Sequence, residues 1–372
     1  MQNNKIIIIG GGLAGLIAAI HLSKIGFKII VLEKNTYPKH KVCGEYISNE
    51  VLDYLKYLDI DIQDLQPSNI NKLHFATTSG KSLFTDLLLG GFGVSRFALD
   101  EFLYKKALSV GCEIHQENVE NISFNEDFFI IKTTNGKLYE SEIAIGAFGK
   151  KSNIDQQLKR KFTFQKSPWL GVKAHYKVNF DDDLVGLYNF DGGYCGVSKV
   201  ENNIVNICYL ASFESFKKYK NIKDFQQKVL CKNPILKNIF ENAELIFEKE
   251  LTISQISFEN KNAAENHILM IGDTAGLINP LCGNGMAMAI HSAKIVSEQI
   301  EKYANNEIKS RQELEISYQK IWNFNFKSRI KTGKILASIM QKPILSNFLL
   351  SLLVIFPSLL KIIIKKTHGK PI

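Results

Sequence analysis

The sequence lacks the residue patterns on which hydrolytic and metal-dependent chemistry usually depends. Its six cysteines include no C-x-x-C pair, and no His/Cys spacing fits a zinc site. No Ser/His/Asp arrangement stands out, and no pair of carboxylates suits hydrolysis. Basic residues do not form a stripe interleaved with aromatic side chains, so we expect no nucleic acid partner. These absences are expected of a protein whose chemistry is carried by a bound cofactor.

The composition is otherwise that of an ordinary globular protein. At 372 residues the chain can bury a sizeable core and form about two domains. Charged residues make up 22% and the net charge is +9, to which we give little weight because lysine is common throughout the chain. The first apolar stretch is broken by glycines and has no small-residue cleavage site after it, so we expect no signal peptide. With unpaired cysteines, this predicts reduced thiols and a cytoplasmic location.

An apolar run over residues 5–9 leads directly into a glycine-rich turn. The run is apolar without alternation, which predicts a short buried strand. The glycines have the spacing G-x-G-x-x-G, in which the first allows a tight turn and the second lets a pyrophosphate approach the backbone. The third lets the following helix lie close to the strand. These glycines are Gly10, Gly12 and Gly15.

A helix and a second strand complete this first motif. The helix is expected over residues 13–24, and the amides of Leu13 and Ala14 at its start would face phosphates. The next strand, over residues 27–32, ends in Glu33, where a dinucleotide-binding fold needs a carboxylate for a ribose hydroxyl. We therefore expect Glu33 and the adjacent Lys34 to bind a dinucleotide. A glycine-rich turn in some other α/β protein is the alternative.

A second glycine-rich segment lies about 260 residues further along the chain. A buried strand is expected over residues 268–271, and a helix is expected to start near Gly283 or Gly285. The carboxylate of Asp273 could accept ribityl hydroxyls, and the helix N-terminus could stabilise negative charge on a reduced flavin. Together the two segments indicate FAD rather than NAD. The expected contacts here are Gly272, Asp273, Pro280, Gly283, Asn284, Gly285 and Met286.

The distal segment resembles the FAD motif of the superfamily of aromatic hydroxylases (para-hydroxybenzoate hydroxylase-like) and geranylgeranyl reductases. Residues 96–103 resemble its R-x-x-x-D-x-x-L helix start, and residues 41–45 resemble the K-V-C-G stretch of the geranylgeranyl reductase branch. The resemblance covers residues 1–50, 94–155 and 266–300. It implies that the 41–45 loop passes over the flavin, with Cys43 near the reaction centre. The contacts it implies are Lys41, Cys43, Gly44 and Arg96.

Two positions depart from the hydroxylase pattern. Phe148 stands where many hydroxylases have an acid, which puts a hydroxylase-style contact with the pyridine nucleotide in doubt. Gly276 stands where hydroxylases often have histidine. Both departures lean away from the best-known hydroxylases, and neither excludes hydroxylation.

Cys43 and Cys282 are the expected catalytic residues because both fall in flavin-proximal motifs. They would shape or tune the environment of the ring, or exchange electrons with it as a disulfide. The other cysteines are expected to pack in the core.

In the middle of the chain, His175 is the best acid/base candidate, although a strand histidine is more often simply packed. Tyr194 is the candidate for a substrate pocket, since its glycine neighbours let a substrate approach.

The expected fold class is α/β. It consists of a Rossmann-like FAD-binding domain of the glutathione reductase type, a smaller substrate domain with a mostly antiparallel sheet, and C-terminal helices. Strands in the smaller domain are expected over 169–177, 184–189, 194–199 and 203–210, with a helix over 225–240 interrupted near Pro234. The expected domains are 1–69 with 95–165 and 266–340 for FAD, 70–94 with 166–265 for substrate, and 341–372 as an apolar and basic tail.

The tail contains 18 uncharged residues, 343–360, followed by lysines. A transmembrane helix usually needs ~20 mainly apolar residues, and Asn347, Pro357 and three serines weaken that interpretation. Three interpretations remain open. The tail could be a helix pair packed on the protein or over a substrate tunnel, a peripheral contact with the inner face of the membrane, or a true span.

The combined motifs predict an FAD-dependent oxidoreductase acting on a small, hydrophobic, lipid-like substrate. Only one dinucleotide motif is present, so NAD(P)H would dock transiently or a partner protein would supply electrons. We favour NAD(P)H-dependent hydroxylation of a phenolic or similar compound. The alternatives are reduction of carbon–carbon double bonds and an electron-carrier flavoprotein. A flavin halogenase is less favoured, since no W-x-W-x-I-P segment is present.

Overall fold

The computed structural model describes residues 4–219 and 221–372. One domain is built on a six-stranded sheet in the order β17-β18-β10-β1-β2-β6. The first strand lies in the middle and pairs in parallel with both neighbours, which explains why it is apolar on both faces. The strands are β1 (Lys5–Ile9), β2 (Lys28–Glu33), β6 (Glu113–Gln116), β10 (Ile143–Gly146), β17 (Ala264–Glu265) and β18 (Ile268–Met270).

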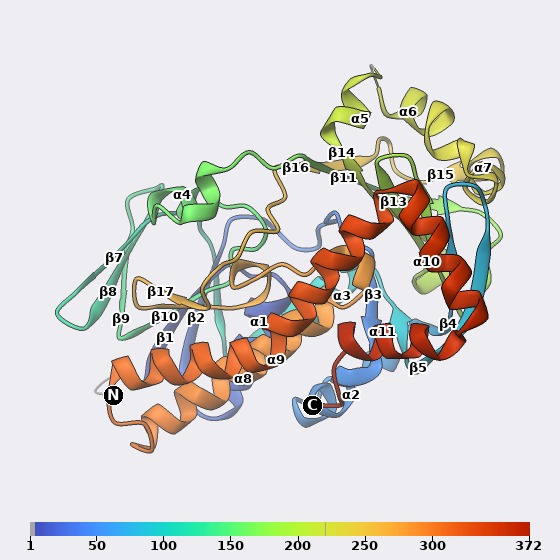
Figure 1. The fold of residues 1–372 in the computed structure, drawn as a ribbon. Helices are drawn as coiled ribbons and strands as arrows, with labels where there is room; N and C mark the ends of the chain where they lie inside the picture. Colours follow the sequence, from blue (N-terminus) through green and yellow to red (C-terminus); the bar gives the residue numbers. More distant parts are fainter. Residues whose placement is uncertain (1–3, 220) are drawn as a thin grey trace.

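Helices cover this sheet, and the first of them follows β1 directly. Helix α1 contacts both α3 and α8, so segments far apart in the sequence form one layer (Figure 1). A small antiparallel sheet of β7, β8 and β9 extends the domain. The elements are α1 (Leu13–Lys24), α2 (Leu52–Tyr57), α3 (Arg96–Ser109), β7 (Val119–Asn125), β8 (Phe128–Thr133), β9 (Leu138–Ser141), α4 (Asn153–Gln157) and α8 (Gly285–Ala304).

The second domain is built on a nine-stranded sheet in the order β15-β11-β14-β13-β12-β4-β5-β3, with β16 paired to β11. All described pairs are antiparallel except β4 with β12. The strands are β3 (Tyr46–Ser48), β4 (Ser68–Ala76), β5 (Ser82–Gly93), β11 (Trp169–Lys177), β12 (Leu184–Phe190), β13 (Gly193–Lys199), β14 (Val205–Ser212), β15 (Glu244–Leu245) and β16 (Leu251–Ser254).

The fold class expected from the sequence is confirmed, with local differences in the second domain. Strand β14 begins two residues later than expected, because residues 201–203 form a tight turn in which Asn202 has a φ of 58°. The expected helix over 225–240 is two helices, since Asn233 caps the second and Pro234 occupies its first position. The helices here are α5 (Phe213–Lys217), α6 (Ile222–Lys228) and α7 (Pro234–Glu241).

Three C-terminal helices run from the first domain onto the second (Figure 1). They are α9 (Arg311–Met340), α10 (Pro343–Ile355) and α11 (Pro357–Thr367). Leu353, Leu360 and Ile364 from the last two pack with Leu73 of β4, so this pair covers part of the sheet. Within the described residues no single helix is long and apolar enough to span a membrane. One pair, Arg311–Met340 with Ile344–Leu353, meets the length and composition criteria together but is bent by 114°.

Candidate functional site

The glycine-rich turn after β1 is closed by backbone contacts. A Cβ on Gly15 would overlap the carbonyl oxygen of Gly10, and one on Gly10 would overlap that of Ala147. Gly10 also has a φ of +106°, which L side chains rarely adopt. Glu33 at the end of β2 accepts hydrogen bonds from the amides of Gly11 (2.8 Å) and Asn35 (2.9 Å). Glu33 therefore braces the turn and also lines the cavity beside it.

Two cations from different segments converge on Gly12. The Nζ of Lys41 and Nη2 of Arg96 would lie 3.7 and 3.8 Å from a Cβ at this position. Both are paired with Asp100, at 2.8 Å for Lys41 and 2.7 Å for Arg96. Burial opposes the charge of Asp100, but the two cations hold its pKa below the ordinary value. Two positive charges against one negative charge leave a net positive site beside an open glycine, which suits an anionic group.

A cavity of about 600 Å³ runs along these residues between β1, the 39–46 loop and the start of α8. It brings the two glycine-rich segments, 262 positions apart, to one space. Gly15 and Asn284 do not line it, since Gly15 packs against the turn. The predicted contacts that line it are Gly10, Gly12, Leu13, Ala14, Glu33, Lys34, Lys41, Cys43, Gly44, Arg96, Gly272, Asp273, Pro280, Gly283, Gly285 and Met286.

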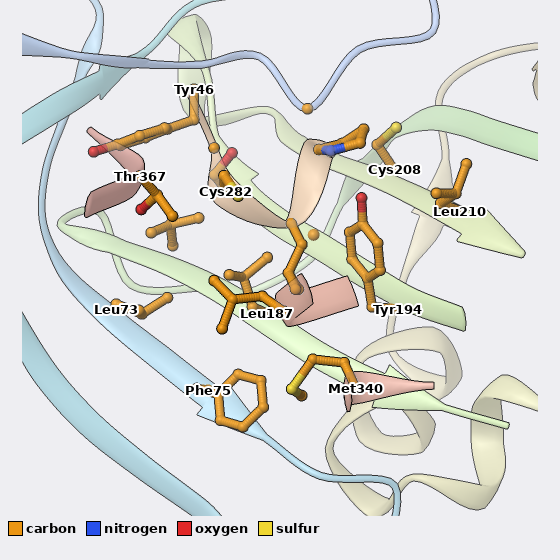
Figure 2. Close-up of a pocket in the computed structure, with 18 of the residues that line it drawn as sticks. Tyr46, Leu73, Phe75, Leu187, Tyr194, Cys208, Leu210, Cys282, Met340 and Thr367 are labelled. Atoms are coloured by element: carbon orange, nitrogen blue, oxygen red, sulfur yellow. The ribbon is translucent and has the colours of Figure 1, made fainter. Parts of the chain in front are cut away.

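A second cavity of about 190 Å³ lies beside the first, and its walls are almost entirely apolar (Figure 2). Tyr194 lies in its wall, as the sequence suggested, with its hydroxyl pointing toward the side on which Cys208 lies. Leucines and isoleucines from α10 and α11 close another side. The two cavities meet at seven shared lining residues: Val42, Cys43, Gly44, Tyr46, Lys150, Pro280 and Gly283.

One thiol lies at this junction, and two more line the apolar cavity beside it. The Sγ of Cys43 lies 3.4 Å from the Sδ of Met286, while Cys282 and Cys208 line the apolar cavity. Burial raises the pKa of Cys282 to about 12, and burial followed by the proximity of Cys43 raises the pKa of Cys208 to about 12. All six cysteines are free. The Cys282 and Cys208 thiols are therefore neutral near pH 7 and act as packing groups rather than nucleophiles.

The loop that holds Cys43 is anchored by a buried carboxylate. Glu45 accepts from the Nζ of Lys173 (2.6 Å) and contacts Nε2 of His175 at 2.7 Å. The amide of Arg96 also donates to it at 2.7 Å. Burial opposes its charge, yet Lys173 and His175 hold the pKa of Glu45 below the ordinary value. His175 lines neither described cavity, and its contact with Glu45 fits the packed strand histidine that was the alternative to an acid/base role.

A second buried carboxylate fixes the end of the chain near the start of α8. Glu50 accepts from the side-chain amide of Asn284 (2.9 Å) and from the backbone amide of Gly369 (2.7 Å). Arg329 of α9 pairs with its other oxygen at 3.1 Å. Asn284 thus stabilises the turn before α8 from behind the cavity instead of lining it.

Comparison with known proteins shows to which family the chain belongs. The family model described as "FAD binding domain" matches residues 3–311. This chain belongs to that FAD-binding family. Its relatives include conditioned medium factor receptor 1 of Dictyostelium discoideum, which is 24% identical over 86% of this chain and 67% of that protein. They also include a digeranylgeranylglycerophospholipid reductase of Methanosarcina acetivorans (25%, covering 85% and 80%) and the putative FAD-dependent monooxygenase YetM of Bacillus subtilis (22%, covering 81% and 85%).

Solved structures agree on the fold of this FAD-binding protein. The flavin-dependent brominase Bmp2 matches with a TM-score of 0.79 at 17% identity, covering 97% of this chain and 92% of that one. The flavin-dependent halogenase CmlS matches with a TM-score of 0.78 at 17% identity, covering 91% and 66%. At such identity the likeness concerns the fold alone. With its family and relatives, the chain is an FAD-dependent oxidoreductase.

The cavity of the FAD-binding domain fits FAD by its own chemistry. The cations at Gly12 and the start of α1 suit the pyrophosphate, as the motif predicted. The start of α8 opens onto the junction with the apolar cavity, where an isoalloxazine ring would meet a partial positive charge. Gly276 packs against Trp322, whose Cζ2 would lie 2.8 Å from a Cβ. Aromatic packing therefore explains why this family member has no histidine there.

Two features of the site were not predicted from the sequence. Lys150 reaches the junction and donates to the carbonyl of Val42 at 3.1 Å. The pattern noted at Phe148, two residues earlier, concerns the pyridine nucleotide and does not point to Lys150. The Lys173–Glu45–His175 cluster was indicated in part by the sequence. Residues 173 and 175 share one face of a strand, and Glu45 belongs to the K-V-C-G-E segment, but no pattern shows that the two segments meet.

We expect Lys41→Met to weaken FAD binding about tenfold at low salt and less at high salt, because one charge-assisted contact to phosphate is lost and such contacts are screened. A titration that follows quenching of FAD fluorescence measures this. Lys105→Met is the matched control, since Lys105 pairs with Glu101 on the same region of chain and does not line the cavity. Equal affinities for the two variants would contradict the placement of Lys41.

Proposed function

We propose that this protein is an NAD(P)H-dependent monooxygenase that hydroxylates a phenolic or similarly electron-rich, hydrophobic substrate. The observation that carries the proposal is the junction of the two cavities at Cys43, Lys150 and Gly283. A substrate held in the apolar cavity would present one end to the reacting edge of the flavin. A sizeable apolar cavity beside the flavin site also argues against a protein that only carries electrons.

The wall of the second cavity supports a lipid-like substrate. Leu187 of β12, Phe75 of β4 and Met340 of α9 surround the space in Figure 2, and leucines and isoleucines from the tail close it. Burying a hydrocarbon chain here would contribute about 0.8 kcal/mol for each methylene removed from water. With a substrate bound, the same wall would limit the access of water to the reacting end, which would reduce unproductive side reactions of the cofactor.

Lys150 favours a substrate with an acidic hydroxyl. It lies among the residues shared by both cavities, and among the described lining residues there, it is the single charged side chain. A phenol that enters this space would lie near an ammonium group, which stabilises the phenolate form. A phenolate is more electron-rich than a phenol. Lys150 would thus activate the ring toward hydroxylation while the apolar wall orients its chain.

The cofactor and its electron donor complete the reaction. When bound and reduced, FAD would supply the electrons that activate molecular oxygen. Overall, one oxygen atom enters the substrate and the other leaves as water, while NAD(P)H and a proton are consumed. The chain's own contribution would be to hold the pyrophosphate at Lys41 and Arg96, which lie beside Gly12, and to limit water at the junction. Because only one dinucleotide motif is present, NAD(P)H would dock transiently.

Reduction of an isoprenoid double bond is the second candidate. It is favoured by the position of Cys43 at the junction and by relatives named digeranylgeranylglycerophospholipid reductases. Hydride transfer to carbon must be completed by a proton. Burial raises the pKa of Cys282 and Cys208, which line the apolar cavity near the junction, to about 12 each, so these two thiols are poor acids. We place hydroxylation first because Lys150 lies at the junction itself, where its ammonium group would stabilise a phenolate.

Oxygen uptake separates the two candidates. With FAD-loaded protein, NADPH and an alkylphenol as probe, we expect substrate-stimulated oxygen consumption and a product heavier by one oxygen atom. Lys150→Met should reduce this rate at least about tenfold (~1.4 kcal/mol) with unchanged FAD content. Lys151→Met is the control, because Lys151 lines the FAD cavity but does not reach the apolar one. Product formation without oxygen would contradict hydroxylation and support double-bond reduction.

A further inference from the structure

The positive charge of the protein is concentrated in its last part. Residues 316–372 contain ten lysines and arginines and no aspartate or glutamate. The other 315 residues hold 36 basic and 37 acidic residues, so the net charge of +9 arises from this segment alone. Arg329 is bound to Glu50, but none of the nine lysines forms an ion pair with any described residue. These lysines are therefore available to an external anion.

Helix α10 exposes apolar side chains on the face that points away from the protein. Ile344 is 84% exposed, Phe348 64% and Ile355 68%, and their spacing of four and seven residues places them on one stripe. The opposite face, with Leu350 and Leu353, is buried. A helix that is apolar all round is normally enclosed. The outer stripe of α10 has no cover within the described structure.

The same pattern of apolar and basic side chains continues on the neighbouring helices. On α9, Phe324 is 87% exposed and stands between the exposed Lys320 and Lys327 on one face of the helix. On α11 the exposed face carries Lys361 and the pair at 365–366. The three helices contact one another and lie along one side of the molecule (Figure 1). We name the exposed side chains of residues 320–366 on these helices the tail face.

We propose that the tail face docks the protein onto an anionic phospholipid bilayer. The apolar stripe of α10 would enter the boundary between headgroups and acyl chains, and the unpaired lysines would lie on lipid phosphates. Charge complementarity selects this occupant, since acidic side chains are absent from the whole segment. A soluble acidic partner would match the lysines, but it would leave three strongly exposed apolar side chains without an apolar environment.

Docking would also explain what the inner side of the tail does, and this step rests on the proposed function. Leu353 and Leu360 face inward and line the apolar cavity, so α10 and α11 would lie between the bilayer and that cavity. A lipid-like substrate could then move from the membrane to the flavin without crossing water. The binding step itself requires no substrate.

Vesicle flotation tests the docking step with the full, FAD-loaded protein. The probes are vesicles of phosphatidylcholine alone, and of phosphatidylcholine with about one third phosphatidylglycerol. We expect the protein to float with the anionic vesicles, to float less at high salt, and to remain unbound with neutral ones. Failure to float with anionic vesicles overturns the proposal, even if the same face captures an acidic protein.

Two triple variants separate charge from apolar insertion. Lys361→Gln with Lys365→Gln and Lys366→Gln should weaken partitioning about fivefold for each lysine removed. Replacing Ile344, Phe348 and Ile355 by serine should weaken it more than tenfold. None of these six lines either cavity, so FAD content should stay unchanged.

The matched control also removes three lysine charges, but at positions outside the tail face. Lys217→Gln with Lys218→Gln and Lys223→Gln alters exposed lysines on or beside α5 and α6, away from the tail face. We expect this variant to float as the unaltered protein does. An equal loss in control and tail variants would overturn the proposal. If flotation is lost while substrate-dependent oxygen uptake is intact, the docking proposal fails and the proposed function stands. If the protein floats but shows no substrate-dependent oxygen uptake, only the proposed function is contradicted.

Discussion

The Gly15→Val protein is expected to be isolated without FAD and with a free energy of unfolding lower by at least about 3 kcal/mol. A Cβ on Gly15 would overlap the carbonyl oxygen of Gly10, and both residues belong to the glycine-rich segment expected to bind the pyrophosphate. The helix and the strand would have to separate, which also disturbs the buried residues around them. Flavin absorbance of the purified protein and a denaturant midpoint measure the two effects.

The control for this variant is a glycine that does line the FAD cavity. A Cβ on Gly44 would meet no atom within 4 Å, and this residue has no left-handed φ, so Gly44→Ala should retain FAD and stability. The contrast matters because both glycines belong to segments that the sequence associates with FAD. Retention of flavin by Gly15→Val would show that the close helix–strand contact is not required.

The Glu45→Ala protein is expected to lose about 3–5 kcal/mol of stability, since the fully buried Lys173 would be left without its partner. The loop that carries Cys43 would also lose its anchor, so we expect weaker FAD retention as well. The denaturant midpoint reports the first effect and flavin content the second. Glu45→Gln combined with Lys173→Met removes both charges and should recover most of the stability. An exposed-pair control, Asp59→Ala, should leave the midpoint nearly unchanged.

The pH dependence of stability follows from the same cluster. Lys173 and His175 together outweigh burial and lower the pKa of Glu45 in the folded protein. Its stabilising contribution is therefore fully present above the unfolded-state pKa of about 4.3 and is lost as pH falls from there through the lower folded-state value. The variant with both Glu45→Gln and Lys173→Met should show less acid sensitivity over this range. An unchanged acid profile would contradict the role of Glu45.

The parts of the fold that were predictable depend on local pattern. The strand, glycines and helix from residue 5 to 24 follow one another directly, so hydrophobic pattern and turn chemistry identify them. The distal segment was found for the same reason. Glu45 and Lys173 are 128 positions apart in the sequence. Their contact depends on where the 39–46 loop lies against strand β11, which no local sequence pattern encodes. Lys150 reaches the junction only because residues 42 and 150 meet in space.

The tail shows a different reason for incomplete prediction. Its composition is consistent with packing, membrane contact or a span, because all three need apolar residues. The structure places Leu353 and Leu360 inward and Ile344 and Phe348 outward. Only the directions of the side chains separate a helix that closes a cavity from one that also presents an apolar outer face.

The parallel pairing of β4 with β12 has a consequence for how a substrate enters. These strands come from segments about 110 residues apart, and β3, which follows the Cys43 loop, joins the same sheet through β5. The sheet of the second domain is thus joined to the Cys43 loop through β3 and its backbone hydrogen bonds to β5, so lifting the sheet would break strand pairing. Helices α10 and α11 are held to this sheet mainly by side-chain packing. A movement of the helical pair that admitted a substrate would therefore break fewer backbone hydrogen bonds than a movement of the sheet.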